Sequence, residues 1–75
     1  MTLDATITAV LAYCDGSSPT CPTGYRQTAD AFRRRNADWY AHPHDYSRSA
    51  HEDWAIDRYI LTTCDIPRIY ARRAA

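Results

Sequence analysis

Residues 42–51 read HPHDYSRSAH, and this stretch decides the fold because it separates two helical patterns. Pro43 cannot continue a helix, and it drives His42 before it towards extended backbone. Asp45 and Ser47 then offer N-caps for a following helix. The stretch therefore predicts a bend, with one helix ending near its start and the next beginning near its end.

The segment before the bend carries an aromatic residue at every seventh position. Tyr25, Phe32 and Trp39 have the spacing that places side chains on one face of an α-helix. We expect a helix over residues 24–41, with this aromatic ridge along one of its faces.

The segment after the bend predicts a second long helix, over residues 48–63. Ser49 with Glu52 three residues later has the form of a capping box. Apolar side chains spread around most of this helix rather than along one stripe: Trp54, Ile56, Tyr59, Ile60 and Leu61. Because a helix that is apolar on most sides is usually covered from several directions, we expect it at the centre of the fold.

Apolar residues at intervals of three and four predict another helix at the N-terminal end, over residues 3–15. Thr2 is its expected N-cap, and Gly16 is the glycine expected just past its end. The following segment, GSSPTCP, is dense in turn-forming residues and cannot continue the helix.

A short fourth helix is expected at the C-terminal end, over residues 66–73. Asp65 is its expected N-cap, and Pro67 is tolerated in its first turn. The sequence contains no alternating strand pattern of useful length and no repeat of 20–50 residues. The prediction is thus a single all-α domain over residues 1–75, a small bundle of three main helices plus a short C-terminal helix.

The charge balance argues against general attraction to polyanions. Nine arginines, with no lysine, balance nine acidic residues, so the formal net charge is zero. Broad electrostatic binding to nucleic acid or to an anionic membrane is therefore not expected. The N-terminal apolar run lacks the basic residues of a secretory signal and is too short to span a bilayer. We expect a cytoplasmic protein with no membrane partner and with its three cysteines reduced.

The histidines of the bend are candidate metal ligands, and we weighed them against a structural role. A site built from His42 or His44 with His51 and Cys64 is the available combination. Its spacing does not match a zinc motif, since no second histidine follows four residues after His51. We therefore expect a bend without metal or cofactor, and no enzyme activity.

Arginine and tyrosine supply the candidate binding surface. Six of the nine cationic residues lie in two short segments, FRRRN and PRIYARR, and several tyrosines lie off the main helical stripes. Tyrosine, tryptophan and arginine dominate protein interfaces. The candidate partner-binding residues are Arg33, Arg34, Arg35, Tyr40, Tyr46, Arg68, Tyr70, Arg72 and Arg73.

Two functions follow from these observations. The first is an intracellular protein-binding module that covers the surface of another protein or of a second copy. Its size suits a small inhibitor or adaptor of the kind that phages and mobile elements encode. The alternative is a small nucleic-acid-binding accessory protein in which the two arginine segments contact phosphates.

Overall fold

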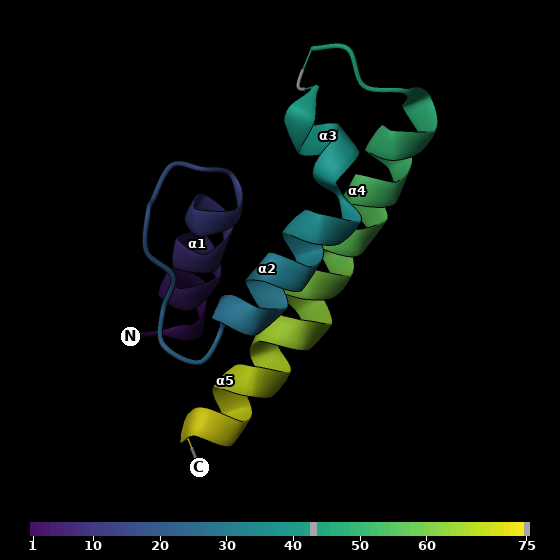
Figure 1. Ribbon diagram of the computed structural model, residues 1–75. Helices are drawn as coiled ribbons and strands as arrows, with labels where there is room; N and C mark the ends of the chain where they lie inside the picture. Colours follow the sequence, from purple (N-terminus) through teal and green to yellow (C-terminus); the bar gives the residue numbers. More distant parts are fainter. Residues whose placement is uncertain (43, 75) are drawn as a thin grey trace.

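The computed structural model describes the backbone of residues 1–42 and 44–74, and this part of the chain is helical with no strand (Figure 1). The small all-α bundle predicted from the sequence is confirmed. The molecule measures 41 × 23 × 18 Å along its principal axes. In chain order the elements are α1 (Leu3–Cys14), α2 (Arg26–Arg35), α3 (Ala37–Ala41), α4 (Arg48–Ile60), the π-helical segment η1 (Leu61–Asp65) and α5 (Ile66–Ala74).

Helix α1 begins and ends at the residues that the sequence marks. The hydroxyl of Thr2 accepts a hydrogen bond from the backbone N–H of Ala5 at 3.1 Å. Gly16 has a φ of 83°, and its N–H donates to the carbonyl of Tyr13 at 3.2 Å. A residue with a side chain is strained at this φ, so glycine suits the position that follows a helix end.

The helix expected over residues 24–41 is divided into α2 and α3 at Asn36. Gly24, with a φ of 94°, delays the start to Arg26 because its backbone is not helical. The amide of Asn36 donates to the carbonyl of Phe32 at 2.8 Å and to the carboxylate of Asp57 on α4 at 2.9 Å. The backbone of Asn36, with φ −114° and ψ 25°, leaves the helical region, and α2 ends there.

The two helices expected over residues 48–63 and 66–73 are joined end to end into one long rod (Figure 1). Asp65 therefore does not cap a new helix but lies inside the π-helical segment. The N–H of Ile66 reaches five residues back to the carbonyl of Leu61. Pro67 has no N–H and its ring would clash with a carbonyl four residues back, and the wider turn accommodates both features.

The core lies between α1, α2 and the junction of η1 with α5. Its largest fully buried side chains are Val10, Cys14, Phe32, Leu61 and Ile66. The expectation that the helix over residues 48–63 occupies the centre is wrong for α4, which has no buried residue, and Leu61 is the only residue of that range in the core. Helix α4 instead extends past the core and contacts α3 along one side. Its apolar residues on the other side therefore face solvent.

Candidate functional site

The most exposed apolar surface of the helices lies on α4. Ile56, Tyr59 and Ile60 are 62%, 67% and 43% exposed. They are three and four residues apart, so they share one face of the helix. We call these three residues the apolar patch. Polar and charged groups border it, since Ile56 and Ile60 line a shallow groove with Arg35, Asn36, Asp53 and Asp57.

A charged contact between α2 and α4 orients the apolar patch. Arg35 donates two hydrogen bonds to the carboxylate of Asp57, from Nε at 2.8 Å and from Nη2 at 3.0 Å. The hydrogen bonds from Arg35, followed by the one from Asn36, hold the pKa of Asp57 below its ordinary value. The same contact with Asp57 raises the pKa of Arg35. Both groups therefore stay charged at neutral pH, and α4 is tied to α2 with its apolar patch facing outwards.

An aromatic cluster holds the other end of α4. The rings of Trp39 on α3 and Trp54 on α4 are stacked, with centroids 3.9 Å apart and planes 3° apart. Tyr46, from the bend, stacks on His51 at 5.0 Å. The indole N–H of Trp39 donates to Nδ1 of His51 at 3.3 Å. These contacts pack the bend against α4 and occupy the ring of His51.

The structure does not gather the candidate metal ligands. His42 is the C-cap of α3, and His44 is exposed in the turn that follows. Cys64 is exposed on η1. Among the described residues, no three His, Cys, Asp or Glu side chains are placed to share a metal ion.

The cysteines are free thiols with different surroundings. Burial, the largest cause, raises the pKa of the Cys14 thiol to about 11. The pKa of Cys21 is also raised, mainly by burial. Since the thiolate is the reactive form, the raised pKa lowers the reactivity of Cys14 at neutral pH.

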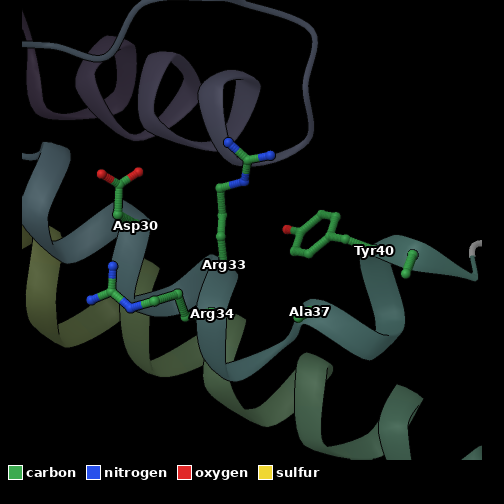
Figure 2. A pocket seen from close by; sticks show the side chains of 6 residues that line it. Asp30, Arg33, Arg34, Ala37 and Tyr40 are labelled. Carbon is green, nitrogen blue, oxygen red and sulfur yellow. The ribbon is translucent and has the colours of Figure 1, made fainter.

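A hollow with a volume of about 490 Å³ lies on the α2–α3 segment and is lined by residues of these two helices (Figure 2). Arg33 points from α2 towards α1, where its guanidinium lies 5.6 Å from the centre of the Tyr13 ring. The hydroxyl of Tyr13 donates to Asp30 at 2.6 Å. This network joins α1 to α2, and it leaves a wide, open hollow rather than an enclosed one.

Tyr40 also borders this hollow, but its hydroxyl is already engaged. It donates to the carboxylate of Asp15 at 3.0 Å and accepts from the indole N–H of Trp54 at 3.3 Å. Burial of the ring is the main reason that the pKa of Tyr40 is raised. Tyr40 therefore connects the end of α1 to α4 within the chain.

The structure brings only some of the candidate arginines together. Arg35, Arg68 and Arg72 line one cavity of about 260 Å³, which Asp65 also lines. Arg34 and Arg73 lie elsewhere, and the guanidinium of Arg73 packs against Gly24. The hydroxyl of Tyr70 donates to the carbonyl of Met1 at 3.1 Å. The two arginine segments thus share a surface through three residues.

Sequence reasoning missed the role of Ile56, Tyr59 and Ile60 as an exposed surface. The sequence places these residues on the side of α4 away from Trp54 and Leu61, but its periodicity does not determine which of the two sides is covered. Covering all sides of this helix requires several neighbouring elements, and a chain of 75 residues has too few helices to supply them.

Comparison with known protein families, curated proteins and solved structures finds no match. No helix in the described part of the chain combines the length and the apolar character needed to cross a membrane.

Proposed function

We propose that this chain is a small intracellular protein-binding module that works by covering a partner surface with the apolar patch on α4. The observation that carries the proposal is the exposure of Ile56, Tyr59 and Ile60 on one helix face. A contiguous apolar surface with a polar border is typical of interaction sites. An inhibitor or adaptor of the phage type would act in this way, by blocking or bridging a surface.

The size of the apolar patch suits binding of moderate strength. Fully burying one large apolar side chain contributes about 1.5–3 kcal/mol, so these three partly exposed side chains supply roughly 3–5 kcal/mol. Tyr59 adds a rigid aromatic anchor, which is the residue type that dominates interface energetics. Bordering charges, including Asp53 and Arg35, would select among partners rather than supply the affinity.

Nucleic acid binding is the second candidate, and the cavity shared by Arg35, Arg68 and Arg72 favours it. Two features weaken it. Arg35 is already paired with Asp57, and Asp65 adds a negative charge to the same cavity. Binding to phosphates through this cavity would weaken steeply with salt and would be lost in Arg68→Ala/Arg72→Ala. Salt-independent association that survives this double substitution would exclude it.

Site-specific photo-crosslinking in the native host tests the preferred function. A benzoylphenylalanine at position 59 replaces an exposed tyrosine by another aromatic side chain, and the same group at the exposed Thr8 on α1 is the control. We expect protein adducts at position 59 and not at position 8, and their loss when Ile56→Glu is added. No adduct at position 59, or equal adducts at both positions, would contradict the proposal.

A further inference from the structure

Two residues of the apolar patch, Ile56 and Ile60, also belong to a longer stripe on the rod formed by α4, η1 and α5. Asp53, Ile56, Ile60, Cys64 and Arg68 follow one another at intervals of three or four residues, and all are exposed. In an α-helix, each residue lies about 40° further around the helix axis than the residue four positions before it. A long stripe with this spacing would therefore rotate gradually around the helix and leave one side. The π turn contains one extra residue. This residue shifts the residues after it by about 100° around the helix axis, in the direction that opposes the gradual rotation. The stripe therefore stays on one side of the rod.

The two ends of this stripe carry opposite charges. Asp53 precedes Ile60 in the rod, and Arg68 follows it. Because the π turn adds a residue with little added length, each of the two lies about 10 Å from Ile60 along the helix axis. Neither side chain forms an ion pair within 4 Å with another residue that the structure describes. The residues of the stripe are thus acidic at one end, apolar in the middle and basic at the other end. Arg35, which is paired with Asp57, borders the acidic end, and Asp65 borders the basic end.

Two copies of such a stripe are complementary in charge when they run in opposite directions. An antiparallel copy places the acidic end of each stripe opposite the basic end of the other, and it also opposes the two helix dipoles favourably. The zero net charge of the chain gives no long-range repulsion between copies. A parallel copy would instead place like charges side by side at both ends.

The exposed area is also in excess of what one chain of this size shows. A folded monomer of 8.6 kDa exposes about 4,700 Å², whereas this chain exposes 5070 Å². The difference, roughly 400 Å², is about half of the ~800 Å² that each partner covers in a stable complex. An interface that covered this area on both copies would bury about 800 Å² in total, which lies at the weak, transient end of the range for protein complexes.

We infer that the surface covering the apolar patch is a second copy of this chain, packed antiparallel about a two-fold axis near Ile60. Ile60 then packs against its own copy, and Ile56 packs beside Cys64 of the other chain. Asp53 pairs with Arg68 of the other chain, and symmetry repeats both contacts. This inference rests on the proposed binding function of the apolar patch and names its partner.

Sedimentation of the purified full chain with a charge-swap series tests the inference. We expect the wild type to pass from monomer to dimer in the micromolar range. Asp53→Arg and Arg68→Asp each replace two attractive pairs by two repulsive ones, so each should raise the dimer dissociation constant tenfold to thirtyfold at low salt. The double variant restores both pairs and should return within about threefold of the wild type.

Two controls separate this result from general effects. Asp45→Arg makes the same charge change at an exposed position in the bend and should leave the dissociation constant unchanged. The increase in the dimer dissociation constant caused by Asp53→Arg or Arg68→Asp should be smaller in 1 M salt, because salt screens exposed charges. A chain that stays monomeric at millimolar concentration, or a double variant no better than the singles, would overturn the inference. If the dimer inference fails but the photo-crosslinker at position 59 forms adducts with a different protein, the proposed binding function is still supported.

Discussion

Asp57 is the residue whose removal should most clearly reveal what holds α4 in place. Its carboxylate accepts two hydrogen bonds from Arg35 and one from the amide of Asn36. Asp57→Ala removes all three bonds without creating a large cavity. One N–H of the Asn36 amide keeps its bond to the carbonyl of Phe32, whereas the other N–H, which bonds to Asp57, loses its acceptor.

The magnitude follows from the exposure of each partner. Arg35 is 52% exposed, so its ion pair is screened and contributes about 0.5–1 kcal/mol. The bond from the buried amide of Asn36 to a charged acceptor contributes about 1.5 kcal/mol. The sum is about 2 kcal/mol, which corresponds to a fall in Tm of roughly 8–16 °C for a domain of this size.

Thermal unfolding by circular dichroism in dilute solution measures the loss, with Asp45→Ala as the control for removing an exposed carboxylate. The control should change the free energy of unfolding by less than about 0.5 kcal/mol. The pKa of Asp57 is lower in the folded chain than in the unfolded chain. The contribution of Asp57 to the free energy of unfolding is therefore complete above the ordinary carboxyl pKa of 3.8, and it is lost as the pH falls through the pKa of the folded state. The difference between Asp57→Ala and the wild type should therefore be constant from pH 6 to 8 and shrink below about pH 4. Equal stabilities for Asp57→Ala and the control would refute this account of how α4 is held.

Three further predictions concern the core, the turn after α1 and the thiols. Phe32→Ala removes a fully buried ring and should cost about 3–5 kcal/mol, enough to leave the chain largely unfolded by circular dichroism, whereas Phe32→Leu should retain the fold. Gly16→Ala places a side chain at a φ of 83° and should lower the free energy of unfolding by about 1 kcal/mol in urea titrations; an unchanged midpoint would contradict this. Iodoacetamide at pH 8 should modify the exposed Cys64 first and leave Cys14, whose pKa is about 11, unmodified while the chain is folded. Mass spectrometry of the peptides reads the order, and early modification of Cys14 would show that the core opens.

The helices that the sequence predicted well are those with local start and stop signals. The Thr2 hydroxyl and the glycine at position 16 bound α1 within one residue of the expectation. Ser47, one of the caps considered, begins α4 by accepting from the N–H of Ala50. Caps and turns act through neighbouring residues, so a single sequence contains the information.

The differences arise where a distant residue decides the local structure. Asn36 ends α2 in part because Asp57, 21 residues later, accepts its second hydrogen bond. The rod continues past Asp65 because a π turn accommodates Pro67, and the sequence pattern alone favours a break at that position. In the candidate site, the arginines and tyrosines were visible by residue type. The exposure of Ile56 depends on which side of α4 packs against α3, and periodicity does not determine that side.

The effect of Ile56→Glu tests most directly the claim that the apolar patch is a binding surface. Two quantities are measured: the position-59 adducts in the native host and the Tm at a concentration where the wild type is monomeric. Since Ile56 is 62% exposed, the account predicts that adducts disappear while Tm changes by only a few degrees. Adducts that persist at the wild-type level would contradict it, as would a Tm loss as large as that of a core substitution.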